Sequence, residues 1–445
     1  GGFDAVIGNP PYVRQELIKD AKSYFKTHYE TFFGTADWYI YFIEKALSLL
    51  RENGRFGFIV ANKWMRANYG KPFRQWLKTR HITQLIDFGD LPVFQSATAY
   101  PCILLIKKND SPEVFHAATV DTLAFDDLSA HVAENQFRVK KSGLEDAGWT
   151  LVDEKTQDLL AKLRHTGVPL GEYVDGEIYY GIKTGLNKAF VIDGATRAQL
   201  IADDPKSDAL IRPFALGKDI KRYQPLPGER YLILIPKGWT GMHRDGGASA
   251  WQWFKANYPA IAAHLEPWAE KARKRYDKGE YCWELRTCDY YGKFEKPKIM
   301  FAEIALTGQF TMDLDSIYCD TTGYILGSDS FYLLGLLNSK LCNFFFSNIS
   351  SSIRGGFFRW KRQYVEALPV CHANAGKSEQ IAALAEKMME MNRKMADIKV
   401  PVEKERLRRQ IEAVDRQIDQ LVYELYGLTP GEIEIVEKTV NRPCN

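Results

Sequence analysis

The sequence offers little that would hold the chain together covalently or through a metal. Its 7 cysteines are scattered over 445 residues and include no C-x-x-C pair, which argues against a disulfide framework and against a structural zinc site. The histidines are isolated as well, so we assign no metal. Scattered thiols of this kind suit a reducing cytoplasm, which is the compartment we expect.

Long hydrophobic runs and a strong charge of one sign are also lacking. The longest apolar runs, such as 56–61 and 102–106, fall far short of the ~20 residues that a membrane span needs, so no membrane partner is expected. The net charge is only +3, from 59 Lys+Arg against 56 Asp+Glu. A surface that binds a polyanion must therefore arise from clustering of basic residues, not from a bulk excess.

Residues 1–110 alternate between strand and helix patterns. The spacing of apolar residues predicts two helices, over Asp37–Arg51 and Lys71–Lys78. Strands are expected at Phe3–Gly8, Arg55–Ala61, Ile82–Phe88 and Cys102–Lys107. Strands separated by helices indicate an α/β domain with a mainly parallel sheet.

The rest of the chain changes character twice. Residues 111–150 are polar with weak periodicity and are interpreted as a connecting region. Residues 151–370 mix short strands with turn clusters, which indicates a second, α+β domain. Residues 376–445 carry a heptad stripe on two helices, joined where Pro401 interrupts the pattern. We favour a helical hairpin that packs on its own chain over an intermolecular coiled coil, because each stripe spans only two to three heptads.

One tetrapeptide indicates chemistry. Asn9-Pro10-Pro11-Tyr12 directly follows the first strand, at the end of the strand where open α/β sheets place their ligands, and would occur by chance in roughly 1 in 10³ chains of this length. Consecutive prolines hold the loop extended. The Asn9 side-chain oxygen and the Pro10 carbonyl then make two convergent acceptors for a planar –NH₂ group, and Tyr12 offers a flat ring beside them. A rigid turn is the alternative interpretation.

This motif, directly after a strand, resembles motif IV of the N6-adenine DNA methyltransferases. The segments that follow keep the order of that family: Asp37–Tyr41, Gly54–Val60 and Leu91–Phe94 resemble its later motifs. In the second domain, Gly181–Ile192, Ile211–Phe214, Trp283–Arg286, Pro297–Ile299 and Leu333–Asn343 resemble a TaqI-like target-recognition domain. Single-chain type IIG restriction–modification enzymes carry this pairing. The implied fold is the C-terminal part of a Rossmann-like methyltransferase sheet, an α+β recognition domain and a helical hairpin.

The resemblance also implies a reaction. The target adenine is flipped out of double-stranded DNA, and its amine takes a methyl group from S-adenosylmethionine. Asn9 and Pro10 would hold the amine, Pro11 would keep their loop extended, and Tyr12 would stack on the base. Phe94 would pack against it from another side, or else be a core aromatic.

In this family a Gly-rich loop and an acidic residue that bind the cofactor precede motif IV. Only eight residues precede Asn9 here. We therefore expect most of the S-adenosylmethionine site to come from an N-terminal segment or a separate subunit, and weak or no activity without it. Exposing the first strand as a sheet edge would otherwise be a liability.

Candidates for DNA contact lie in two places. The segment 353–362 has four basic residues, no acidic ones and three aromatics, from which we single out Arg354, Arg359, Trp360, Lys361 and Arg362; a surface loop with its aromatics turned inward is the alternative. Lys183, Thr184 and Asn187 could contact DNA or form a structural turn, and Arg286 could contact DNA or pair with Trp283. The run Lys271, Arg273, Lys274 and Arg275 is interpreted as a solvated helix face.

The function predicted from the sequence is an adenine-specific DNA methyltransferase of a prokaryotic restriction–modification system. Its rival is a DNA-specificity module without catalysis, in which Asn9–Tyr12 is vestigial. A methyltransferase that acts on an amine of a protein or an RNA is a third hypothesis, disfavoured by the resemblance of the second domain.

Overall fold

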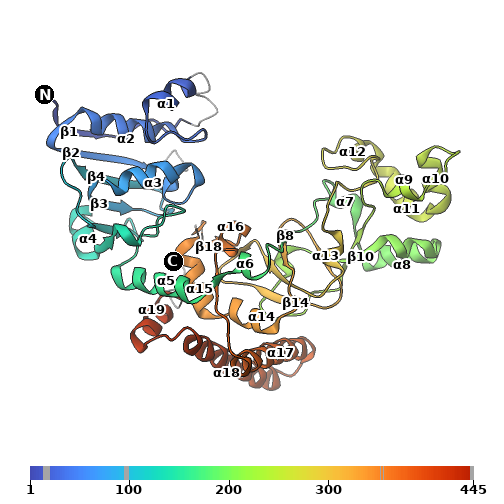
Figure 1. Cartoon of the computed structure of the whole chain (residues 1–445). Coiled ribbons are helices and arrows are strands. Elements are labelled where there is room, and N and C mark those ends of the chain that lie inside the picture. The colour runs from blue at the N-terminus through green and yellow to red at the C-terminus, as the bar shows by residue number, and fades with distance from the viewer. Residues whose placement is uncertain (14–20, 95–99, 351, 354, 441–445) are drawn as a thin grey trace. The chain divides into compact units, whose positions relative to one another are not determined.

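The chain forms two compact units in a computed structural model that describes residues 1–13, 21–94, 100–350, 352–353 and 355–440 (Figure 1). The first unit comprises residues 1–165 and 345–356, and the second comprises residues 166–344 and 357–442. Within the described residues, no helix combines the length and the apolar character that crossing a membrane requires.

A six-stranded sheet forms the first unit, in the order β1-β2-β4-β3-β5-β6. Its strands are β1 (Phe3–Gly8), β2 (Leu50–Ala61), β3 (His81–Asp87), β4 (Pro101–Lys107), β5 (Val114–Thr119) and β6 (Phe137–Lys140). The pairs β1–β2 and β3–β5 are parallel, whereas β4 lies antiparallel between β2 and β3, and β6 is antiparallel to β5. The sheet is thus mixed and not mainly parallel, because the alternation of apolar residues that predicts a strand is the same for either direction.

The predicted connecting region is part of this sheet. Residues 111–150 contain β5, β6 and the helix α4 (Leu128–Asn135). The pattern was too short to be recognised, since β6 has only 4 residues and the exposed His116 interrupts the apolar run of β5. The prediction of an irregular connection there is therefore wrong.

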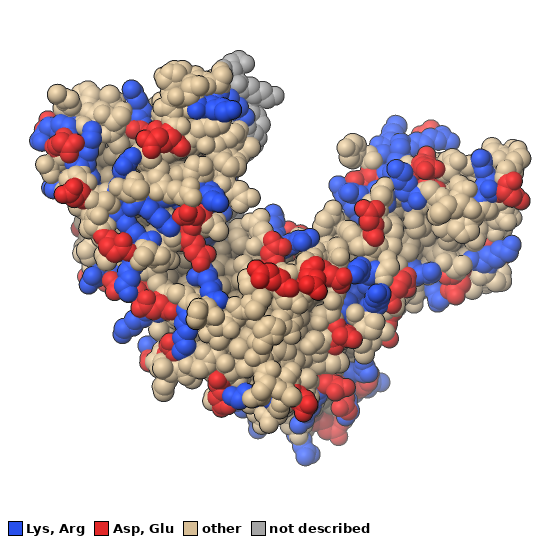
Figure 2. Space-filling view, viewed as in Figure 1, with Lys and Arg blue, Asp and Glu red and all other residues tan. Residues whose placement is uncertain are grey.

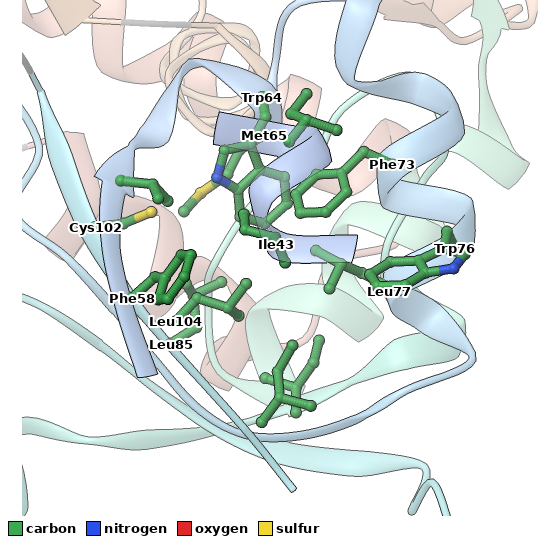
Figure 3. Packing of buried hydrophobic residues seen from close by; sticks show 14 of the residues in the cluster. Ile43, Phe58, Trp64, Met65, Phe73, Trp76, Leu77, Leu85, Cys102 and Leu104 are labelled. Carbon is green, nitrogen blue, oxygen red and sulfur yellow. The ribbon is translucent and has the colours of Figure 1, made fainter. Parts of the chain in front are cut away.

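Helices cover both faces of the sheet. On one face, Ile43 of α2 (Trp38–Leu49) and Phe73 and Leu77 of α3 (Lys71–Lys78) pack against Leu85 and Leu104 of the sheet (Figure 3). On the other face, a smaller cluster joins α4 to β3 and β5. The α3 helix spans the predicted residues, and α2 ends two residues sooner than predicted because β2 begins at Leu50. The remaining helices of this part are α1 (Lys22–His28) and α5 (Glu154–Thr166), and α15 (Lys340–Ile349) and β17 (Ser352–Ile353) come later in the chain.

The second unit is built on two four-stranded sheets. They have the orders β15-β10-β11-β9 and β14-β12-β16-β8, while β13 pairs with β18 and β19 pairs with β7. Its strands are β7 (Val168–Pro169), β8 (Ile178–Tyr180), β9 (Val191–Asp193), β10 (Ile211–Ala215), β11 (Arg230–Ile233), β12 (Lys298–Ala302), β13 (Ile304–Ala305), β14 (Phe310–Asp313), β15 (Tyr318–Cys319), β16 (Gly323–Leu326), β18 (Phe357–Arg359) and β19 (Pro369–Val370). Its shorter helices are α6 (Leu170–Tyr173), α7 (Asn187–Phe190), α8 (Gly194–Asp203), α9 (Trp239–His243), α10 (Ala250–Asn257), α11 (Pro259–Leu265), α12 (Ala269–Arg273), α13 (Tyr291–Phe294), α14 (Phe331–Leu337) and α16 (Arg362–Val365).

The predicted helical hairpin is present and packs on its own chain. It consists of α17 (Ala375–Asp397) and α18 (Pro401–Leu425), followed by α19 (Pro430–Val440). Ile381 of α17 is fully buried and lies so close to α14 that a Cβ on Gly335 would stand 2.6 Å from its Cγ2. The guanidinium of Arg222 donates a 2.8 Å hydrogen bond to Asp415 of α18. The hairpin is thus part of the second unit.

Candidate functional site

The tetrapeptide Asn9–Tyr12 extends from the carboxyl end of β1. There Gly8 pairs with Phe58 of β2, and a Cβ on Gly8 would stand 2.9 Å from the ring of Phe58. Pro10 is buried, whereas Asn9 and Pro11 are exposed. The buried proline fixes the loop to the sheet, and the Asn9 side chain is left accessible to a substrate.

Aromatic rings stand beside this loop. The ring of Tyr12 meets Phe94 edge-on at a centroid distance of 6.2 Å and lies 6.4 Å from the ring of Tyr39. Its hydroxyl donates a long, 3.4 Å hydrogen bond to the carbonyl of Ile59, and burial raises the pKa of Tyr12 to about 12. Tyr12 as a whole remains 38 % exposed. Tyr12 and Phe94, which the sequence assigned to one site from distant positions, therefore lie together.

Two polar residues at the same edge of the sheet were missed by sequence reasoning. Asn62 follows β2 and donates a 2.8 Å hydrogen bond to Asp87, the last residue of β3. The same carboxylate accepts the backbone N–H of Gly89 at 3.1 Å, and burial raises the pKa of Asp87. This network ties the beginning of the loop that carries Phe94 to the residue that follows β2, across the end of the intervening strand β4. Only their position in the sequence could have indicated these two residues, because each stands where a strand of the sheet ends.

The strand β1 is the terminal strand of the described sheet and carries exposed apolar side chains on one face. Ile7 is 85 % exposed and Phe3 is 59 % exposed, although β1 is a strand of the sheet that holds the candidate site. An uncovered edge strand with apolar side chains is a surface suited to pairing with another segment.

In the second unit, two of the predicted cations lie together. Asp277 accepts an ion pair from Lys183 at 2.9 Å and another from Arg286 at 3.3 Å. The carboxylate is mostly buried, whereas the two cationic side chains are about half exposed. Lys183 and Arg286 are 103 positions apart in the chain, so only the fold brings them to one surface.

Thr184 and Asn187 form a structural turn. The Thr184 side chain is buried, bonds to the Asn187 side chain and accepts the backbone N–H of Leu186 at 3.1 Å. Gly185 adopts a positive φ of 67°, which favours glycine. Of the two alternatives left open for this segment, the turn accounts for Thr184. A buried hydroxyl cannot touch DNA.

The basic segment near residue 360 divides between core and surface. Trp360 is 1 % exposed and packs edge-on against Phe310 at 5.5 Å, so its predicted role as a DNA contact does not agree with its burial. Arg362 is held by Glu366 at 3.1 Å and by the carbonyl of Ile178 at 3.1 Å. Arg359 and Lys361 retain exposed surface. Arg354 lies outside the described residues.

The run of basic residues near α12 is only partly a solvated face. Lys271, Arg273 and Lys274 are exposed as expected. Arg275 is 6 % exposed, with its guanidinium 4.4 Å from the ring centroid of Phe190 and donating 2.8 Å hydrogen bonds to two backbone carbonyls. The charge pattern did not distinguish this buried arginine because three exposed cations precede it closely in the sequence.

Comparisons with known proteins match two separate segments of the chain to two family models. Residues 1–94 match the family model of the Eco57I restriction-modification methylase, and residues 212–370 match that of the TaqI-like C-terminal specificity domain. The chain is thus similar to a methylase over its first part and to a specificity domain over a later part.

Two longer relatives align with nearly the whole chain. The chain is 25 % identical to the type II methyltransferase M.PaeR7I of Pseudomonas aeruginosa, over 97 % of this chain and 72 % of that protein. It is 26 % identical to the type II methyltransferase M.XhoI of Xanthomonas vasicola, over 98 % and 76 %. Among solved structures, the type IIL restriction-modification enzyme MmeI, in complex with DNA, has the same fold with a TM-score of 0.62 at 14 % identity. The chain spans 57 % of the length of MmeI.

Most of the candidate residues lie in one or the other of the two matched segments. The methylase segment includes Asn9–Tyr12 and Phe94, and the specificity domain includes Arg286 and the residues near Trp360. Lys183 lies before the matched specificity domain, yet the ion pairs with Asp277 attach it to that domain.

Proposed function

We propose that this protein transfers a methyl group from S-adenosylmethionine to the N6 amine of an adenine flipped out of double-stranded DNA, as part of a restriction–modification system. The observation that carries the proposal is the loop Asn9–Tyr12 at the carboxyl end of β1, with Tyr12 against Phe94. The names of the relatives support methyl transfer and a restriction–modification setting. The chemistry of the loop suits a planar amine, and adenine as the target is what the resemblance of the loop to motif IV of the N6-adenine DNA methyltransferases implies.

The role that we propose for the loop is to position the adenine amine for methyl transfer. The lone pair of an adenine amine is delocalised into the ring, which makes the nitrogen a poor nucleophile. The Asn9 oxygen and the Pro10 carbonyl accept its two hydrogens and favour a pyramidal nitrogen whose lone pair points away from the ring. Prearranged acceptors of this kind lower the barrier without a separate general base. S-adenosylmethionine, when bound, supplies an electrophilic methyl group.

The aromatic side chains hold the base. A flipped adenine loses its stacking partners in the duplex, and the half-exposed ring of Tyr12 offers a replacement. Phe94 meets Tyr12 edge-on, so it fixes the orientation of that ring and borders the same space. The pKa of about 12 keeps Tyr12 neutral at the pH of an ordinary assay, so its ring meets the base without a charge on the hydroxyl.

The cofactor is expected to bind mainly beyond the free edge of β1. The exposed side chains of Phe3 and Ile7 suit the packing of a further segment or subunit there, and Asn9 stands at the end of that strand. We propose that this additional segment supplies most contacts to S-adenosylmethionine, while the described chain supplies the acceptors for the adenine amine.

Methyl transfer by an Asn9→Ala variant tests the proposal. The protein at its natural full length is incubated with plasmid DNA and S-adenosylmethionine that carries a radioactive methyl group, and label in DNA is counted. The variant should lose at least about 100-fold in rate, as expected for removal of one acceptor from a preorganised site, while it binds DNA with unchanged affinity. The control is Asn135→Ala, an exposed asparagine at the end of α4, which should leave the rate unchanged.

The same assay addresses the alternative functions. Sequence-specific DNA binding by the wild-type protein with no methyl transfer would favour the specificity module without catalysis. Transfer to RNA or protein amines but not to duplex DNA would favour the third hypothesis. Full activity in Asn9→Ala would contradict the catalytic role of the loop.

A further inference from the structure

A tyrosine projects from the surface on which Lys183 and Arg286 meet. Tyr276 is 98 % exposed, more than any other large hydrophobic side chain among the described residues. Its neighbour in the chain is Asp277, the carboxylate that pairs with both cations. A fully exposed aromatic ring gives up the stabilisation of burial, so its position beside two cations calls for an explanation.

The backbone that carries this ring is firmly anchored. The residue before it, Arg275, is buried and donates to the carbonyls of Cys282 and Glu284 at 2.8 Å and to that of Thr184. The carboxylate of Glu284 is fully buried and accepts the backbone N–H groups of Gly238, Thr240 and Glu280 at 3.1, 3.0 and 2.9 Å. Because the chain is fixed on both sides of Tyr276, ordering the ring on a partner costs little additional conformational entropy.

The surroundings of the ring are basic. Arg273, Lys274 and Lys278 are exposed in the same segment, and Figure 2 shows Lys and Arg gathered over the part of the second unit where α12 lies in Figure 1. Asp277 compensates part of this charge and orients the side chains of Lys183 and Arg286. Cations that surround a projecting aromatic ring match a nucleic acid, which presents phosphates on both sides of flat bases.

We propose that Tyr276 inserts its ring at a base step of the recognised duplex and stacks on a base there, while Lys183 and Arg286 contact the flanking phosphates. The inference rests on the proposed function, because it takes duplex DNA as the partner of the second unit. It adds a residue that no resemblance indicated and separates two roles: the ring contacts a base, and the cations neutralise phosphate. Wedge residues of this kind partly unstack the step that they enter.

The test measures DNA binding and its salt dependence. The sequence methylated by the full-length protein is first located by sequencing DNA from cells that produce it. Binding of a 40-base-pair duplex containing that sequence is then followed by fluorescence anisotropy at several NaCl concentrations. Tyr276→Ala should bind about 5- to 100-fold more weakly with an unchanged salt slope, because the ring releases no counterions. Tyr276→Phe should bind like the wild type, and Lys183→Gln should reduce the salt slope by about one.

A matched control and a local probe make the result specific. Met242 on α9 is 76 % exposed in the same unit, and Met242→Ala should bind like the wild type. With 2-aminopurine placed at successive positions of the site other than the target adenine, the fluorescence at one step should change when the wild-type protein binds. It should keep its free-duplex value with Tyr276→Ala, whose melting temperature should be unchanged.

Two results would overturn the inference: wild-type affinity in Tyr276→Ala, or a loss of affinity accompanied by a reduced salt slope. Failure of the proposed function is a separate outcome, seen as the absence of methyl transfer and of DNA binding by the wild-type protein itself.

Discussion

Replacing Tyr12 tests whether its ring, and not its hydroxyl, serves the reaction. The hydroxyl makes one long bond of 3.4 Å to the carbonyl of Ile59, so its loss in Tyr12→Phe should cost less than about 1 kcal/mol and lower kcat/KM by less than about fivefold. Tyr12 is 38 % exposed and belongs to the loop that begins at Asn9. Stacking of a base on an aromatic side chain contributes about 1–3 kcal/mol, so Tyr12→Ala should lower kcat/KM by about 5- to 150-fold.

The assay combines initial rates of methyl transfer with a probe of the flipped base. Rates are measured over a range of DNA concentrations, and 2-aminopurine replaces the target adenine in a parallel binding experiment. Stacking on Tyr12 quenches the flipped base in the wild type, so Tyr12→Ala should give a brighter complex than Tyr12→Phe. Equal losses in the Phe and Ala variants would assign the effect to the hydroxyl, and full activity of Tyr12→Ala would refute the contact with the base.

Three further predictions concern the network at the sheet edge, the core and the pH dependence. Asp87→Ala removes the acceptor shared by Asn62 and Gly89 and should slow methyl transfer at saturating DNA by tenfold or more, with DNA affinity retained; a normal rate would show that the network does not position the Phe94 loop. Trp360→Ala should lower the free energy of unfolding by about 3–5 kcal/mol, measured by urea denaturation, whereas a loss of DNA affinity in a fully stable variant would restore its role as a DNA contact. Burial, with a contribution from Asp415, raises the pKa of Asp419 to about 6, above the ~4 of an unfolded chain. The folded state therefore binds that proton more tightly, and stability falls as the pH rises from about 4 to 6, by up to about 3 kcal/mol. The melting temperature of the wild type should therefore fall over this pH range, and that of Asp419→Asn should fall less. The same pH profile in both proteins would contradict the assignment to Asp419.

The sequence predicted those parts of the site that local patterns encode. Two consecutive prolines after an apolar run determine both the loop and its place at the end of a strand, so Asn9–Tyr12 could be located without the fold. Phe94 was found through the order of motifs along the chain. The stripe of α17 and α18 was equally local, since burial of Ile381 and Ile418 follows from their spacing.

Features that depend on distant contacts could not be predicted. Asn62 and Asp87 are ordinary polar residues in the sequence, and they form a pair only because β2 and β3 end at the same edge of the sheet. Asp277 gathers Lys183 and Arg286 only in the folded second unit. Trp360 illustrates the opposite error: its basic neighbours suggested an exposed surface, but a large aromatic ring gains more from burial against Phe310.

The chemical identity of the product tests the central claim most directly. DNA is isolated from cells that produce the full-length protein and from cells that produce its Asn9→Ala variant, then digested to nucleosides and analysed by mass spectrometry. The account predicts N6-methyladenine in the first sample and background levels in the second. Methylation on cytosine alone, or N6-methyladenine at equal levels in both samples, would contradict it.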